Sequence, residues 1–201
     1  MKGKIVNAYK LDVLKELANI GMGHAVTSLA QMLDGEKICM DVPTATLAPL
    51  QDIPELLGGA ELPVAGVFIA SSGDVQLKIL FVLPLESALN LTSILLPDAQ
   101  GNFDALELSA LLEVGNILTS AYLTALSLMT GLKLLPSPPT IAVDMSAAII
   151  STVMAEAHVL DDELVLLQTT LSSRKKRITG HILMLPDYGA LKTIFTLLGI
   201  R

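Results

Sequence analysis

The stretch from Ser109 to Pro139, SALLEVGNILTSAYLTALSLMTGLKLLPSPP, decides how this chain folds. Each residue of a helix advances by about 100°, so four polar residues of this stretch fall within about 60° of one another: Ser109, Glu113, Asn116 and Ser120. The opposite side is apolar, with Leu111, Val114, Leu118, Tyr122 and Ala125. The pattern predicts a helix that buries its apolar side and exposes an acid and an amide one turn apart.

The same arrangement occurs near the N-terminus, where we expect a helix over residues 9–33 that ends at the turn residues Asp34-Gly35. Its polar or small side carries Asp12, Glu16, Asn19 and Gly23, and its apolar side carries Leu14, Leu17, Gly21 and Ala25. An offset of 97 residues places identical residues opposite one another, including Glu16 with Glu113 and Asn19 with Asn116. The chain therefore contains an internal repeat.

The segments between and after these helices read as strands and short helices. Strand patterns cover 37–47, 64–70, 75–83, 134–143, 163–171 and 178–185, and short helices are expected at 52–57, 86–96, 146–157 and 190–198. The β-branched residues of 146–157 would also suit a strand. Pro43 makes the first strand an edge strand or a bulged one. We expect a single α+β domain over 1–201, with an antiparallel sheet and the two long helices side by side on it. Its pseudo-repeats, 9–97 and 104–201, should be related by a pseudo-twofold axis.

Composition excludes several classes of protein. Hydrophobic residues make up 52% of the 201 residues, which is enough for a large aliphatic core, and the net charge of −7 argues against a nucleic-acid partner. Cys39 is the single cysteine, so the pattern favours a reduced, cytoplasmic setting, and its place in an alternating strand predicts a small core residue. The three histidines lack ligand spacing, so no metal site is expected. The first 17 residues lack the pattern of a signal peptide.

One segment is long enough to raise the question of a membrane. Val114 to Leu132 contains no charged residue and has the length of a bilayer-spanning helix. It also contains many polar residues, and it follows Glu113 on the same face as Asn116. We therefore expect a buried amphipathic helix and no membrane insertion. The high hydropathy then reflects either a helix covered on most sides or an oligomer interface.

The two polar faces carry a family resemblance. Asp12-x3-Glu16-x2-Asn19 and Ser109-x3-Glu113-x2-Asn116 resemble the [Asp/Ser]-x3-Glu-x2-Asn signature of the CheC/CheX/FliY chemotaxis phosphatases. The signature continues with a proline about 22 residues later. Pro139 has that spacing from Asn116, whereas Pro43 is one residue further from Asn19. Two motifs favour the CheC type, because CheX is shorter with one motif and FliY carries extra switch-complex regions.

The resemblance implies hydrolysis of the aspartyl phosphate of the response regulator CheY. Phosphoryl transfer depends mostly on positioning and electrostatics, and an amide both accepts and donates hydrogen bonds. Asn19 or Asn116 would hold the attacking water, and Glu16 or Glu113 would pair with the regulator's active-site Lys. Two further polar residues would support these pairs: Asp12 and Ser109. Mg²⁺ and the phosphorylated Asp belong to the partner, so the chain needs no cofactor of its own.

Other readings stay open. The motif residues also suit a merely solvated helix face, and the chain is also compatible with an adaptor for the receptor deamidase CheD or with a flagellar switch component. For CheD, which the resemblance implies as a partner, we take the exposed-looking acid Asp144 as the candidate contact. His24, two residues off the motif stripe, is a weaker candidate for touching a partner. The basic run 174–177 reads as a solvated turn that is able to steer an acidic partner.

Overall fold

The computed structural model describes residues 6–32, 38–157, 163–173, 177–186 and 189–200. The expected helix end at Asp34-Gly35 and residues 174–176 of the basic run lie outside this part of the chain. The helices of the described part are α1 (Ala8–Met32), α2 (Ile53–Leu56, after a 3-10 turn at Leu50–Asp52), α3 (Leu85–Leu95), α4 (Ala105–Thr130), α5 (Ser146–Ala157) and α6 (Ala190–Leu197). The strands are β1 (Ile38–Pro49), β2 (Pro63–Gly73), β3 (Leu77–Pro84), β4 (Leu134–Pro136), β5 (Thr140–Met145), β6 (Glu163–Ser173) and β7 (Arg177–Pro186).

The strands form one antiparallel sheet, so the predicted α+β fold of a single domain is confirmed. Their order is β1-β6-β7-β3-β2-β4, and β5 also pairs with β2. The hairpins β2–β3 and β6–β7 meet at the centre, and the edge strands of each half pair with the hairpin of the other half. If each strand is replaced by its counterpart in the other half, the same strand order results, read from the opposite edge of the sheet. That symmetry supports our proposal of two pseudo-repeats, 9–97 and 104–201.

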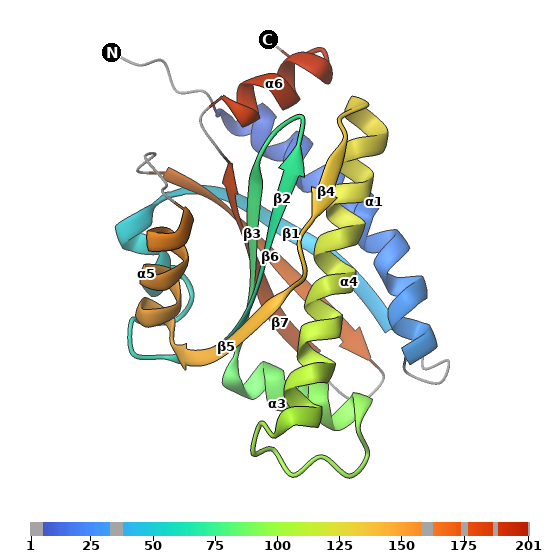
Figure 1. Ribbon diagram of the computed structural model, residues 1–201, viewed down its shortest axis with the longest axis vertical. Coiled ribbons are helices and arrows are strands. Elements are labelled where there is room, and N and C mark those ends of the chain that lie inside the picture. The colour runs from blue at the N-terminus through green and yellow to red at the C-terminus, as the bar shows by residue number, and fades with distance from the viewer. Residues whose placement is uncertain (1–5, 33–37, 158–162, 174–176, 187–188, 201) are drawn as a thin grey trace.

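Helices cover both faces of the sheet (Figure 1). Alternation along β3 sends Ile79 and Phe81 to the core under α1 and α4, and sends Leu80 and Val82 to a second core under α2 and α5. The other central strands alternate in the same way. Because the sheet is buried on both faces, its strands contain many of the hydrophobic residues that make up about half of the chain.

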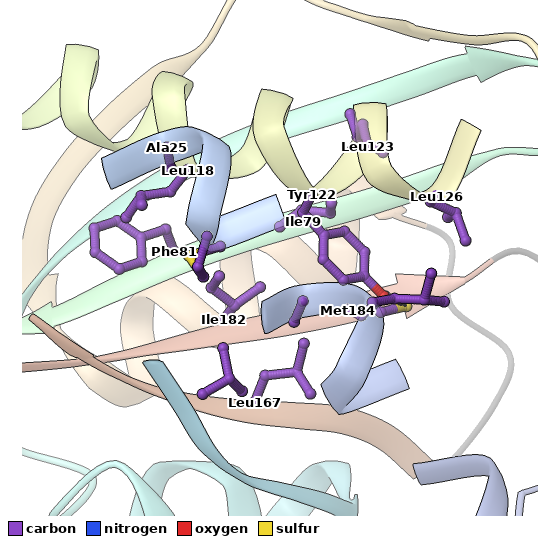
Figure 2. Packing of buried hydrophobic residues seen from close by; sticks show 14 of the residues in the cluster. Ala25, Ile79, Phe81, Leu118, Tyr122, Leu123, Leu126, Leu167, Ile182 and Met184 are labelled. Carbon is purple, nitrogen blue, oxygen red and sulfur yellow. Dashed lines mark hydrogen bonds between the residues drawn. The ribbon is translucent and has the colours of Figure 1, made fainter. Parts of the chain in front are cut away.

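Helix α4 lies against this sheet with the apolar stripe that its sequence predicts: Leu111, Val114, Leu118, Tyr122 and Ala125 are all buried. The Tyr122 hydroxyl reaches the Sδ atom of Met184 on β7 at 3.8 Å, among the aliphatic side chains of the core (Figure 2). Length and composition alone would allow α4 to cross a membrane, but 56% of its most apolar window is buried inside the fold. The apolar run therefore serves the core of the domain.

Helices α1 and α4 lie side by side, as predicted, and they run in opposite directions (Figure 1). Their backbones are in close contact at Gly21, where a Cβ atom would lie 2.9 Å from the carbonyl oxygen of Ala121 and 3.0 Å from the Cα of Tyr122. A side chain does not fit between the two backbones. Gly23, on the motif side of α1, would meet nothing within 4 Å.

The first edge strand both confirms and corrects the sequence predictions. β1 is an edge strand, and its pairing with β6 shifts register between Asp41 and Thr44, around Pro43, as the proline predicts. Cys39, however, is exposed, so its prediction as a core residue was wrong. Successive side chains point to opposite faces, and at this end of β1 the half-buried Met40 takes the covered face.

The helix crossing gives a matched pair of stability predictions. Gly21→Ala should lower the free energy of unfolding by about 1 to 3 kcal/mol, because the new methyl group has to push two backbones apart. Gly23→Ala should raise it by about 0.5 to 1 kcal/mol through better helix propensity alone. Urea unfolding followed by circular dichroism measures both values. An equal response to the two substitutions would contradict the backbone contact.

Candidate functional site

The first motif lies on the side of α1 that faces away from the core. Asp12 and Glu16 are exposed and Asn19 is half-buried, while Leu14 and Leu17 on the other side are buried. The acid and the amide are one turn apart, as the spacing predicts. This face therefore presents an acidic group at the surface with an amide set slightly deeper.

The second motif repeats this geometry on α4. Ser109 and Glu113 are exposed and Asn116 is half-buried. The Ser109 hydroxyl donates to the carbonyl of Ala105 at 2.7 Å, so it turns back onto its own helix. The Ser120 hydroxyl donates to Asn116 Oδ1 at the long distance of 3.4 Å. Both helices thus expose a complete acid–amide pair.

The start of α4 is fixed by two carboxylates that the sequence prediction missed. Asp104 is the N-cap and accepts the N–H groups of Leu106 and Glu107 at 3.0 Å. The buried Glu107 carboxylate accepts the N–H of Gly101 at 2.7 Å and that of Phe103. The sequence signal that could have identified them is the Asp-x-x-Glu spacing of a capping box. These bonds set the position from which α4 presents the second motif.

The two amides differ in what their oxygen atoms accept. Asn19 Oδ1 accepts the backbone N–H of Val42 at 2.8 Å. Val42 lies inside the register shift of β1, between Asp41 and Thr44. The first motif is therefore joined to the edge strand that follows α1, a contact that motif spacing did not predict.

The second half offers Asn116 no such donor from its own edge strand. The pairing of that edge with β2 is interrupted between Pro136 and Thr140, which is the counterpart of the shift in β1. Three of the four residues 136–139 are prolines, which have no N–H. The remaining one, Ser137, donates its N–H to the carbonyl of Ala70 at 2.7 Å.

A groove of about 380 Å³ lies between α1 and α4 beside the second amide. Helix α4 contributes Asn116 and Ser120, and α1 contributes His24 and Ser28. His24, the weaker sequence candidate, is thus brought to the second motif although it belongs to the first helix. The groove leaves the Asn116 side of the helix pair open to a partner.

The remaining candidates are not brought to the motif helices. Asp144 is exposed in β5, and its Oδ1 accepts the N–H of Met145 at 2.7 Å. It lines a pocket of about 220 Å³ between β5 and α5, on the other side of the sheet. Burial lowers the pKa of His181 in β7, and His158 is outside the described residues. Within the described ranges, no three His, Cys, Asp or Glu residues gather as metal ligands would.

Comparison with known proteins identifies relatives of this chain. The CheC-like family model matches residues 10–47 and 106–143, which contain most of the two motif helices and most of the strands that follow them, β1 in the first half and β4 and β5 in the second. The CheY-P phosphatase CheC of Bacillus subtilis (strain 168) is 34% identical over 197 residues, or 94% of each chain. The structure of Thermotoga maritima FliY has a TM-score of 0.79 at 16% identity, covering 96% of this chain and 98% of FliY. A CheX–CheY–BeF3–Mg²⁺ complex from Borrelia burgdorferi gives a TM-score of 0.50 at 20% identity, covering 83% and 95% of the respective chains.

The unequal surroundings of the two amides predict unequal effects on stability. Asn19→Ala should leave the protein about 1 to 2 kcal/mol less stable than Asn116→Ala, because it strands the N–H of Val42 in a part-buried place. Both substitutions gain the same helix propensity, so each is the control for the other. Chemical denaturation measures the difference, and hydrogen exchange should show faster exchange at Val42 in Asn19→Ala alone. Equal stabilities would contradict a structural role for the Asn19–Val42 bond.

Proposed function

This chain belongs to the CheC-like family, and from that membership we propose that it hydrolyses the aspartyl phosphate of the response regulator CheY. The observation that carries the proposal is the 34% identity to the CheY-P phosphatase CheC over 94% of both chains. The fold shared with CheX, in a structure that contains CheY, adds support for CheY as the partner. The chain is accordingly a hydrolase of the chemotaxis system.

The motif residues suit this reaction because they supply positioning without covalent chemistry. The transition state of phosphoryl transfer is loose, so aligning a water molecule in line with the phosphorus atom is a large part of catalysis. We assign that water to the amides of Asn19 and Asn116. Glu16 and Glu113 pair with the active-site Lys of the regulator, which fixes the docking register. Their exposed positions on α1 and α4 support these roles.

Other parts of the machinery come from the partner. The regulator brings the phosphorylated Asp and the Mg²⁺ ion that neutralises phosphoryl charge. Asp12 and Ser109 support the two motif faces from the preceding turn of each helix. We propose a cytoplasmic location, where CheY is available. We also propose that the chain does not insert into a membrane, which the burial of the apolar side of α4 supports.

We also propose a second partner, a CheD-like protein, at a surface away from the motifs. Asp144 is exposed beside a mostly apolar pocket, and the neighbouring Val143 and Met145 are 38% and 52% exposed. An acid flanked by exposed apolar side chains is a suitable anchor for a protein interface. The likeness to FliY, at 16% identity, concerns the fold, so it does not favour a switch component over the phosphatase.

The mechanism predicts how single and double substitutions behave. Asn19→Ala or Asn116→Ala alone should leave residual phosphate release from the other site, and the double variant should lose it. Because Asn→Ala removes the amide and leaves the Glu contact, turnover should fall more than affinity. Glu113→Lys should weaken docking as well, since it places like charges together. Phosphate release against the concentration of phosphorylated CheY measures these effects. A double variant with the parental rate would refute the mechanism.

The partner surface has a separate test. Asp144→Lys should weaken the binding of CheD by about tenfold or more in isothermal titration calorimetry, because it reverses an exposed charge at the interface. Glu86→Lys, an equal charge change at an exposed position of α3, is the control. An unchanged affinity for Asp144→Lys would remove this segment as the contact.

A further inference from the structure

A water-positioning amide works through its oxygen atom. The attacking water has to keep a lone pair directed at phosphorus, so it must donate one of its hydrogens to the enzyme. An amide oxygen accepts that hydrogen. The amide nitrogen, by contrast, is a donor and cannot accept that hydrogen. A productive Asn therefore needs its Oδ1 directed toward the substrate, with a lone pair left for the water.

At Asn19 this oxygen is already engaged. A backbone N–H is a donor, so the atom that faces Val42 at 2.8 Å has to be the oxygen. This bond takes one of the two lone pairs of Oδ1 and holds the oxygen toward the buried Val42. The oxygen is therefore directed inward, which is the wrong direction for positioning a nucleophilic water at the surface.

Among the described residues, no backbone N–H makes the corresponding bond to Asn116, and the residue with the spacing of Val42 in the second half is Pro139. The prolines of 136–139 cannot donate, and the N–H of Ser137 is committed to Ala70. Asn116 Oδ1 accepts a long hydrogen bond from the Ser120 hydroxyl at 3.4 Å, and a hydroxyl rotates away easily. The groove beside Asn116 leaves room for the partner.

We propose that the N–H of Val42 holds the first site in a less productive state than the second, and that the prolines after β4 keep the second site free of such a bond. The register shift of β1 takes Val42 out of the ladder, so its part-buried N–H needs another acceptor, and Asn19 supplies one. Val42 is thus a positioning residue that acts through Asn19. This inference rests on the proposed phosphatase function, and it makes Asn116 the main source of turnover.

The decisive experiment isolates the first site by starting from Asn116→Ala. This variant should lose about tenfold in kcat, whereas Asn19→Ala should lose only about two- to threefold, since the amide of Asn116 carries most of the reaction. Adding Val42→Pro to Asn116→Ala removes the N–H and should raise kcat about fivefold with little change in KM, the equivalent of one net hydrogen bond. A purely structural role of Val42 predicts no such rescue.

Two further variants keep the test decisive. Val42 is only 1% exposed, so Val42→Ala in the same background tests the loss of its side chain while keeping the N–H, and it should give no rise in kcat. Asn19→Gln in the same background extends the amide past Val42 and should raise kcat even if Val42→Pro fails to fold. Circular dichroism checks each fold.

The outcomes separate this inference from the proposed function. No phosphate release by the parent protein would refute the phosphatase function itself. Parental release with equal losses in Asn19→Ala and Asn116→Ala would overturn the inference and leave the function standing. No rise in kcat for either Val42→Pro or Asn19→Gln in the Asn116→Ala background would overturn it as well.

Discussion

The backbone contact between α1 and α4 at Gly21 is the constraint on which the arrangement of this protein depends. Each helix rests its apolar stripe on the sheet and its flank on the other helix. A helix has only about 3.6 residues per turn, so two covered sides leave one narrow side for polar groups. The acid and the amide occupy that side in both helices. The close packing of the pair therefore also decides where a partner meets the motifs.

Much of the fold was predictable because its main signals are local and repeated. The helical spacing of Leu111, Val114 and Leu118 predicted the buried stripe, and Pro43 predicted the interrupted edge strand. The exposure of Cys39 was not predictable, since it depends on which face of β1 the distant helices cover. The positions of the motif side chains on α1 and α4 were predictable from the same periodicity. The bond from Val42 to Asn19 was not, because it depends on how a strand bulges against a helix 23 residues away.

The two halves show how a motif and its surroundings diverge separately. Glu16 and Asn19 match Glu113 and Asn116 in type and spacing, and both pairs are presented on equivalent faces. The two halves differ in the backbone that follows each motif helix. In the first half the N–H of Val42 donates to Asn19, whereas three of the residues 136–139 in the second half are prolines without an N–H. In the second half, the proline that follows the motif takes the position of Val42 and has no N–H to donate.

The interrupted edge strands also affect how this molecule meets other chains. A long, regular edge offers a row of N–H and C=O groups that another strand extends, which leads to aggregation or strand exchange. Here one edge is bulged at Pro43, and the other is broken by Pro136 at the end of β4 and by Pro138 and Pro139 between β4 and β5. Neither edge is a continuous template. Although half of its residues are hydrophobic, the chain therefore resists polymerisation through edge-to-edge strand pairing. Its recognition of other proteins depends on side chains instead.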